Sequence, residues 1–346
     1  MTYTEHLNNL LSQSDLLVRE ASEAEKNQRM TQNQLDYIYE NELFHLLVPE
    51  KNGGAEMDLP CFAKLMEKYA ELDGAFAWVI NLGAGANMFS GFMDEYTANK
   101  IFADKKTCVA GSGAATGTAK KENGGFTING EWKYASGSAH ANWFSLNAII
   151  DGGTEYKSFL VQREKIEILD TWHVYGMKAT SSCDFKVDQV WIPAEYQFDL
   201  QQPSKTTDAP LYRFPFGSLA EINMLVMLTG LAISFTKKVL NYAKLRSIEI
   251  LGFEEMNGAF LEQRERVFTL LDELWTRTVA RLPIEELIED FSLAVNRTAR
   301  SGRELVDRLY PYTGMSTVFE DNEISRVYRD FKVASQHGLL FPRHDV

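Results

Sequence analysis

Cysteine and histidine are scarce in this sequence, and neither residue is spaced like a ligand or redox motif. The 346 residues include 3 cysteines and 6 histidines. The cysteines, Cys61, Cys108 and Cys183, lie far apart without a CxxC pair, which indicates reduced thiols rather than a disulfide framework. Because no HxxxH or similar spacing occurs, no metal site is expected.

An excess of positive charge and long apolar runs are also lacking. The formal net charge of −13 argues against a nucleic-acid partner, because phosphate binding requires a basic face. The most apolar stretch, residues 224–235, is too short to span a bilayer and is expected to be a buried helix. The N-terminus carries no basic region followed by an apolar one, so a secretory signal is not expected. These features predict a cytoplasmic protein without a membrane partner.

Hydrophobic periodicity divides the chain into three parts. Residues 1–105 show helical spacing of apolar side chains, and Thr31 to Gln34 form a potential capping box. The period changes to two in residues 106–205, and helical spacing returns in residues 206–346. The predicted order of helices, strands and helices differs from the βαβ alternation of a doubly wound fold.

A glycine-rich stretch at residues 111–117 invites comparison with a dinucleotide-binding fingerprint. Its spacing is GxGxxxG, and a hairpin signal at Asn123-Gly124-Gly125 follows where that fingerprint requires a helix. The stretch is therefore interpreted as a turn between strands. No nicotinamide-binding Rossmann unit is expected.

Residues 130–144, GEWKYASGSAHANWF, begin and end like a strand but have a centre of small side chains. A strand with a buried face normally carries bulk there. On the residues alone, Ser136 would be expected to bond to neighbouring backbone at a strand edge. The small side chains at the centre of this segment therefore need an explanation that the segment itself does not give.

Motifs in and around this segment supply a resemblance. The segment contains Ile128-Asn129-Gly130, Tyr134-Ala135-Ser136 and His140-Ala141-Asn142-Trp143, and further motifs stand at residues 48–54, 72–78, 176–182 and 190–193. In this order they resemble the acyl-CoA dehydrogenase superfamily over nearly the whole chain. The resemblance implies an N-terminal α-helical domain, a central β-barrel or β-sandwich domain and a C-terminal four-helix bundle. It also implies a flavin bound between the β-domain and the bundle.

Two further stretches favour one branch of that superfamily, the two-component flavin-dependent monooxygenases. They are residues 211–215 and the C-terminal residues 326–340, which resemble the RxxRD…SQH signature of the branch. The dehydrogenases carry a catalytic glutamate in the matching region, whereas this chain carries His337. At the alternative position of that base stand Lys237 and Lys238. The resemblance therefore favours a monooxygenase over an acyl-CoA dehydrogenase.

The resemblance also implies roles for individual residues. The Ser136 hydroxyl would bond to flavin N5 in a catalytic role, and Tyr134 and Ala135 would lie beside the ring. The remaining implied flavin contacts are the backbone of Ala110, Gly111 and Ser112, the loop residues Lys178 and Thr180, and Arg246, which would reach the pyrophosphate of FAD in a neighbouring subunit. The Phe-Gly that normally follows this arginine is replaced by Ser247-Ile248. FAD and FMN therefore both remain open.

His337 is the second catalytic candidate. A lone histidine in a helix is more often structural than catalytic, but at 100° per residue Arg326, Asp330, Val333 and His337 would share one helix face. An imidazole titrates near neutral pH, so it can polarise a substrate hydroxyl or donate a proton to a peroxide oxygen. Arg326, Arg329 and Asp330 are expected to orient it and to hold the bundle together.

The sequence thus predicts a flavin-dependent oxidoreductase. The preferred function is an oxygenase component that uses reduced flavin and O2 to oxidise a small aromatic or heteroatom substrate. A separate flavin reductase would supply the cofactor, and the family implies a homotetramer or homodimer. The alternatives are an acyl-CoA dehydrogenase and a non-catalytic flavin-binding or structural relative.

Overall fold

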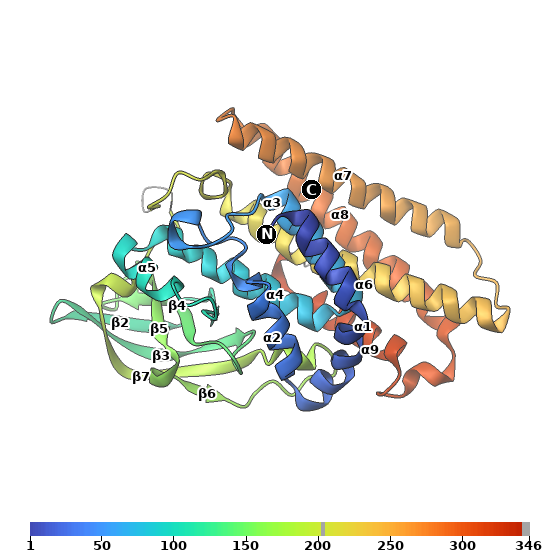
Figure 1. The fold of residues 1–346 in the computed structure, drawn as a ribbon, viewed down its shortest axis with the longest axis horizontal. Helices are drawn as coiled ribbons and strands as arrows, with labels where there is room; N and C mark the ends of the chain where they lie inside the picture. The colour runs from blue at the N-terminus through green and yellow to red at the C-terminus, as the bar shows by residue number, and fades with distance from the viewer. Residues whose placement is uncertain (202–204, 341–346) are drawn as a thin grey trace.

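The chain runs from helices to strands and back to helices in the computed structural model, which describes residues 1–201 and 205–340 (Figure 1). The end of the predicted C-terminal part, residues 341–346, lies outside the described residues. The N-terminal helices are α1 (Tyr3–Asn27), α2 (Gln32–Glu40), α3 (Leu59–Leu72), α4 (Gly74–Asn87) and α5 (Glu95–Phe102). Short 3-10 turns at Leu43–His45, Glu50–Asn52 and Met88–Phe92 connect them.

Local sequence signals set the starts of these helices. The Thr31 hydroxyl accepts a hydrogen bond from the Gln34 backbone (3.2 Å), and the Gln34 side chain accepts one from the Thr31 backbone (3.1 Å). This reciprocal pair satisfies two backbone donors that have no partner within the helix. The predicted capping box is confirmed.

The strands of the middle part form a mixed sheet. They are β1 (Val109–Gly111), β2 (Gly117–Glu122), β3 (Gly125–Ala135), β4 (Trp143–Ile150), β5 (Tyr156–Gln162), β6 (Glu167–Leu169), β7 (Cys183–Pro193) and β8 (Gln197–Phe198). Their order is β6-β7-β3-β2-β4-β5-β8, and β1 pairs with β4 in parallel. Asn123 and Gly124 both have positive φ, as the predicted hairpin between β2 and β3 requires.

The barrel or sandwich is not confirmed. The described strands form one sheet whose ends, β6 and β8, are not paired with each other, so the coarser prediction of a mixed α and β fold is what holds. A period of two shows that a strand has two different faces, but it does not show which strands pair. Closure of a sheet therefore could not be read from the residues.

The C-terminal region is helical, as predicted, and contains α6 (Phe216–Arg246), α7 (Phe253–Val279), α8 (Glu285–Leu309) and α9 (Glu323–Ala334). Helices α6, α7 and α8 run side by side, and α9 packs on α6 (Figure 1). By length and composition α6 could cross a membrane, but 78% of its most apolar window is buried. It is thus the core helix predicted for residues 224–235.

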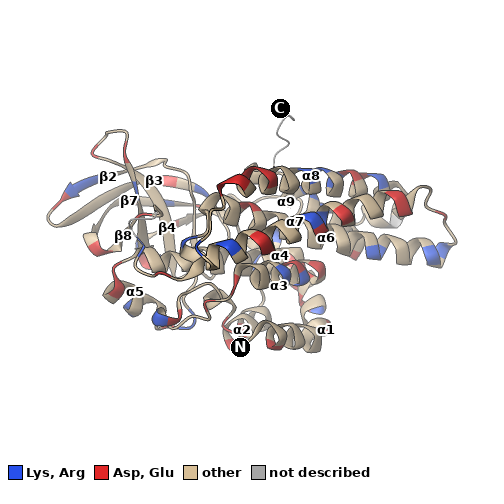
Figure 2. Cartoon of the chain, turned by 90° about the horizontal axis from the view of Figure 1, so that it is seen from above, with Lys and Arg blue, Asp and Glu red and all other residues tan. Residues whose placement is uncertain are grey.

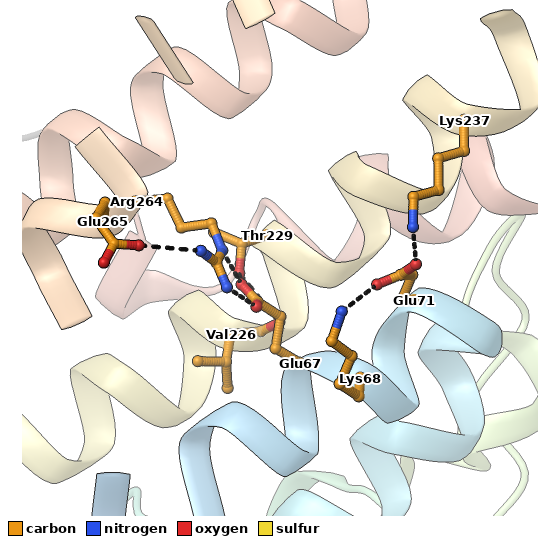
Figure 3. A network of polar contacts seen from close by, with 8 residues as sticks. All are labelled: Glu67, Lys68, Glu71, Val226, Thr229, Lys237, Arg264 and Glu265. Carbon is orange, nitrogen blue, oxygen red and sulfur yellow. Dashed lines mark hydrogen bonds and ion pairs between the residues drawn. The ribbon is translucent and has the colours of Figure 1, made fainter. Parts of the chain in front are cut away.

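A buried carboxylate joins α6 to its neighbours. Glu67 of α3 is 1% exposed, and its Oε1 accepts hydrogen bonds from Thr229 Oγ1 of α6 (2.6 Å) and Arg264 Nε of α7 (2.8 Å) (Figure 3). A second guanidinium nitrogen of Arg264 pairs with Oε2. Two-point contacts of this kind fix geometry as well as charge. Glu67 therefore links the N-terminal helix α3 to two C-terminal helices, α6 and α7.

Surface charge on these helices is mixed. Lys and Arg alternate with Asp and Glu along them (Figure 2). Lys64 of α3 pairs with Asp272 of α7 (3.2 Å), and Lys332 of α9 pairs with Asp307 of α8 (3.0 Å). Exposed pairs contribute little stability individually. They do place Lys and Arg side chains among the more numerous Asp and Glu residues on the helix surfaces.

Candidate functional site

One cavity brings together segments from all three parts of the chain. Its volume is about 440 Å³, and its walls come from α4, β1, β4, β5 and α6 together with residues that follow β3 and α9. The lining includes five residues singled out from the sequence, namely Ala110, Gly111, Ser112, Ser136 and His337. Cavities of this size, mostly apolar with a few polar groups, are typical of small-molecule sites.

The turn after β1 contributes backbone to the cavity. The Ser112 N–H donates to the Ser145 carbonyl oxygen (3.1 Å), which holds the turn against β4. A Cβ on Gly111 would lie 2.1 Å from Ser145 Oγ, so only glycine allows this approach. The glycine-rich stretch is therefore a turn between strands, as interpreted from the sequence.

Residues 130–144 are not one strand. β3 ends at Ala135 and β4 begins at Trp143, so the small residues form a turn between them. Gly137 has φ +84°, its N–H donates to the Thr180 carbonyl oxygen (2.8 Å), and Ser138 Oγ donates to the Ser181 carbonyl oxygen (2.6 Å). The side chains are small because this turn packs directly against residues 180–182.

Ser136 stands at the contact between that turn and α4. Its Oγ accepts a hydrogen bond from Trp78 Nε1 of α4 (3.1 Å) and lies 2.7 Å from Ser182 Oγ. Thr180 Oγ1 lies 2.7 Å from Ser182 Oγ and donates to the Met177 carbonyl oxygen (2.8 Å). Ser136 is thus bonded to side chains and lines the cavity, in contrast to the edge serine expected from the residues alone.

Other predicted flavin contacts do not line this cavity among the described residues. Tyr134 is 66% exposed with its ring against Trp172, and Ala135 is fully buried. Thr180 is buried behind Ser136, within the hydroxyl contacts just described. The structure therefore brings Thr180 near the site but directs Tyr134 to the surface.

Lys178 and Arg246 lie further from the cavity walls. Lys178 Nζ forms an ion pair with Glu320 (3.5 Å). Arg246 is the last residue of α6, and its guanidinium lies over the ring of Tyr242 (5.3 Å from the centroid). Within the described residues, neither side chain lines the cavity.

His337 lies beyond the end of α9, so the prediction that it shares a helix face with Arg326, Asp330 and Val333 is wrong. The helix ends at Ala334, and the Gln336 and His337 N–H groups close a turn on Val333 and Ala334. His337 Nδ1 accepts the backbone N–H of Leu339 (3.4 Å), and this bond leaves the proton of the neutral ring on Nε2.

The surroundings of His337 favour the neutral form of its imidazole. Its ring makes an edge contact with Trp78, the same side chain that donates to Ser136, with 5.9 Å between centroids. Burial lowers the pKa of His337 below the ordinary value of 6.5. A neutral imidazole with Nε2–H available can donate a hydrogen bond to an oxygen in the cavity.

Arg329 and Asp330 do not contact His337, in contrast to the orienting role expected for them. Arg329 Nε donates to the Tyr175 carbonyl oxygen (2.8 Å) and its guanidinium pairs with Glu25, whereas the Asp330 carboxylate accepts the Met177 N–H. Burial raises the pKa of Asp330 to about 7. These side chains clamp the loop before Thr180 onto α9.

Two asparagines in the cavity wall were missed by the sequence analysis. Asn81 of α4 donates from Nδ2 to the Asn223 carbonyl oxygen of α6 (2.9 Å). The Oδ1 atoms of both residues are buried and have no hydrogen-bond partner within residues 1–201 and 205–340. Buried polar atoms normally have partners, so an occupant with donors is expected here. An asparagine inside a strongly apolar helix was the available signal.

The wall chemistry fits a flavin better than it fits acyl-CoA dehydrogenation. A flavin presents a flat apolar ring with polar edges, and the wall offers Phe89 and Phe216 beside the hydroxyls of Ser136 and Ser145. A dehydrogenase needs a carboxylate against the substrate α-carbon. Among the described residues, no Asp or Glu lines the cavity. His337 occupies the wall instead.

Comparisons with curated proteins place the chain near monooxygenases. It is 27% identical over 363 residues to a pigment production hydroxylase of a Rhodococcus species, covering 98% of this chain and 94% of the relative. It is 24% identical to the oxygenase subunit HsaA of a flavin-dependent monooxygenase from Rhodococcus jostii, covering 93% and 91%. No family model matches the chain.

Solved structures agree in fold. The 3-HSA hydroxylase of Rhodococcus sp. RHA1 superposes with a TM-score of 0.90 at 22% identity, covering 98% of this chain and 93% of that one. XiaF from a Streptomyces species, solved with FADH2 and glycerol, gives 0.86 at 22% identity, covering 98% and 92%. The resemblance predicted from the motifs is confirmed: the chain has the acyl-CoA dehydrogenase-like fold and is similar over nearly its whole length to oxygenase components of flavin-dependent monooxygenases.

Proposed function

We propose that this protein is the oxygenase component of a two-component flavin-dependent monooxygenase that oxidises a small aromatic substrate. The observation that carries the proposal is the single cavity joining Ser136, the turn at Ala110 to Ser112, and His337. These residues lie far apart in the sequence and come from two of the three predicted parts, and Asn81 of α4 adds the first part to the same wall. A shared wall is what a cofactor and a substrate that react together require.

The residues proposed to hold the flavin lie on the sheet side of the cavity. Ser136 would stand at the N5 edge of the ring, and the backbone from Ala110 to Ser112 at the pyrimidine edge. When bound, a reduced flavin would react with O2, a chemistry that no amino-acid side chain provides. Arg246, which lies outside its own cavity, is proposed to reach the pyrophosphate of FAD held by a second copy of the chain.

The helical side of the cavity is proposed to bind the substrate. Leu82, Phe89, Phe216 and Met224 offer apolar surface for an aromatic ring. The free Oδ1 atoms of Asn81 and Asn223 would accept donors of the substrate, and His337 Nε2–H would donate to a substrate oxygen. A phenol or a hydroxylated polycycle matches this set, because its O–H both donates and accepts.

Replacing Asn223 by leucine tests this assignment. The substitution keeps a similar shape and removes the Oδ1 acceptor, so a phenol O–H that donates to Asn223 would lose its partner. We expect the Kd of a phenolic ligand to rise about tenfold, and the Kd of the matching ligand without the hydroxyl to stay constant or fall. Equilibrium titration of the two ligands measures the difference. An equal rise for both would contradict a role for the amide oxygen.

Partners and assembly complete the proposal. A separate flavin reductase would deliver the reduced cofactor, as the terms oxygenase subunit and oxygenase component imply for the relatives. The chain is proposed to assemble through its C-terminal helices into a homotetramer or homodimer and to act in the cytoplasm. Domains at residues 1–105, 106–205 and 206–346, with the C-terminal one forming a four-helix bundle, remain the proposed division.

The deciding experiment supplies the purified chain with enzymatically reduced flavin, isotope-labelled O2 and a panel of small phenols. A product that contains one labelled oxygen atom is expected. Reduction of bound flavin by an acyl-CoA without O2 would establish the dehydrogenase instead. If neither oxidised nor reduced flavin binds, the chain is a structural relative without this chemistry.

A further inference from the structure

A continuous chain of hydroxyl groups runs from the buried loop that precedes β7 to the cavity wall. It begins at the Met177 carbonyl oxygen and passes through Thr180 Oγ1 and Ser182 Oγ to Ser136 Oγ, with successive distances of 2.8, 2.7 and 2.7 Å. Trp78 Nε1 closes the chain at 3.1 Å from Ser136 Oγ. Thr180 and Ser182 are 1% and 3% exposed, so bulk water does not compete for these bonds.

Counting protons gives the chain a direction. A carbonyl oxygen only accepts, so Thr180 uses its single hydroxyl proton on Met177. Ser182 must then donate to Thr180, and Ser136 must donate to Ser182. Trp78 Nε1 is a donor only, so it occupies one acceptor position of Ser136. The proton of Ser136 is thereby used inside the protein.

What Ser136 offers the cavity is therefore a lone pair. A hydroxyl oxygen accepts two hydrogen bonds and donates one, and here the donor and one acceptor position are occupied. Because Ser136 lines the cavity, the remaining acceptor position is available to a group bound there. An N–H placed there gains a hydrogen bond, whereas a bare nitrogen acceptor would meet an oxygen lone pair.

We infer that Ser182 and Thr180 are positioning residues that fix Ser136 as a hydrogen-bond acceptor, so that the site selects reduced flavin over oxidised flavin. The inference rests on the proposed function, in which the N5 edge of the flavin stands at Ser136. N5 carries a hydrogen in the reduced cofactor and only a lone pair in the oxidised one. The direction of the buried hydroxyl chain would therefore favour binding of the reduced flavin and release of the oxidised flavin.

The anchoring of the chain supports this selection. The Met177 carbonyl also accepts Trp172 Nε1 (3.1 Å), and the Met177 N–H is bound by Asp330. Gly176 approaches α9 so closely that a Cβ there would lie 2.2 Å from the Arg329 carbonyl oxygen. The terminal acceptor is therefore held in place by α9, and the hydroxyls cannot reverse without breaking the bond to Met177.

Replacing Ser182 by alanine releases the proton of Ser136. The hydroxyl could then donate to N5 of oxidised flavin, and the preference for the reduced form should shrink. We expect the ratio of the oxidised to the reduced Kd to fall about tenfold. For a two-electron couple this corresponds to a decrease of about 30 mV in the midpoint potential of bound flavin. Anaerobic fluorescence titrations with FMN and FAD in both redox states measure the ratio without turnover.

Two variants of Thr180 test the chain at a second position. Valine matches threonine in shape but lacks the hydroxyl, so Thr180→Val should lower the ratio as Ser182→Ala does. Serine restores the hydroxyl, so Thr180→Ser should return the ratio to that of the unchanged protein. A merely structural role for Thr180 would give the opposite order, because valine keeps the methyl group of threonine and serine lacks it.

Ser138→Ala is the matched control, because Ser138 is buried in the same turn but donates to the Ser181 carbonyl oxygen outside the chain. Its ratio should stay constant. If Ser182→Ala and Thr180→Val bind flavin with an unchanged ratio, the inference is wrong while the proposed function stands. If the unchanged protein binds no flavin in either state, the proposed function fails and the inference fails with it.

Discussion

Replacing His337 by alanine is expected to lower kcat/KM for a phenolic substrate about a hundredfold, because general acid–base and donor groups of this kind contribute at least that factor. His337 lines the cavity and lies against Trp78, and within the described residues its Nε2 has no other partner. Steady-state kinetics with a saturating reductase measures the loss. Circular dichroism and flavin titration show whether the variant is folded and loaded.

The pH dependence of the same residue separates a chemical role from a structural one. Burial lowers the pKa of His337, so the neutral ring predominates at pH 7, and activity should fall as the pH drops through the lowered pKa. Protonation of Nδ1 would also break the bond from the Leu339 N–H. His337→Gln, which keeps an N–H donor but does not titrate, should recover part of the activity and lack this acidic limb. If the glutamine variant lost activity over the same acidic pH range, that loss would have to come from a group other than His337.

Replacing Arg264 by alanine is expected to lower the free energy of unfolding by about 3–5 kcal/mol, the loss typical when one partner of a buried ion pair is removed. Glu67 would remain buried, at 1% exposure, with only Thr229 as a side-chain partner (Figure 3). Urea unfolding measures the change. Because Glu67 joins α3, α6 and α7, the destabilisation should affect the whole helical region.

Lys237→Ala is the control for this prediction. Lys237 pairs with Glu71 on the same pair of helices, α6 and α3, but its side chain is 63% exposed. Exposed pairs contribute at most about 1 kcal/mol, so this variant should unfold nearly as the unchanged protein does. Equal destabilisation by both substitutions would mean that burial does not set the strength of the Glu67 pair.

The sequence predicted structure most accurately where a feature depends on neighbouring residues. The capping box at Thr31, the hairpin turn at Asn123-Gly124 and the buried helix at residues 224–235 each depend on neighbours within a few positions or on one helix face, and all three are present. Motifs added the class of enzyme, because short stretches near a shared site keep their residue types and order. They named Ser136 and His337, which the fold brings to one cavity.

Predictions from local pattern were wrong at two places where a helix or strand ends earlier than its pattern indicates. Helical spacing placed His337 on one face with Asp330, yet α9 ends at Ala334. Strand-like flanks suggested a continuous strand at residues 130–144, yet the small side chains close a turn against residues 180–182. At residues 130–144 long-range bonds to residues 180–181 close the turn, whereas α9 ends in a local turn on Val333 and Ala334 that helical spacing does not reveal.

By itself, then, the sequence determined the order of helices and strands and the resemblance to flavin-dependent monooxygenases. Only the tertiary structure decided which residues share the cavity, and it added Asn81 and Asn223, whose oxygens are left without partners. It also decided the direction of the hydroxyl chain at Ser136, since that depends on a carbonyl 41 positions away in the chain, at Met177, that can only accept. The direction of each hydrogen bond in a network depends on every donor and acceptor in it, and folding is what brings those groups together.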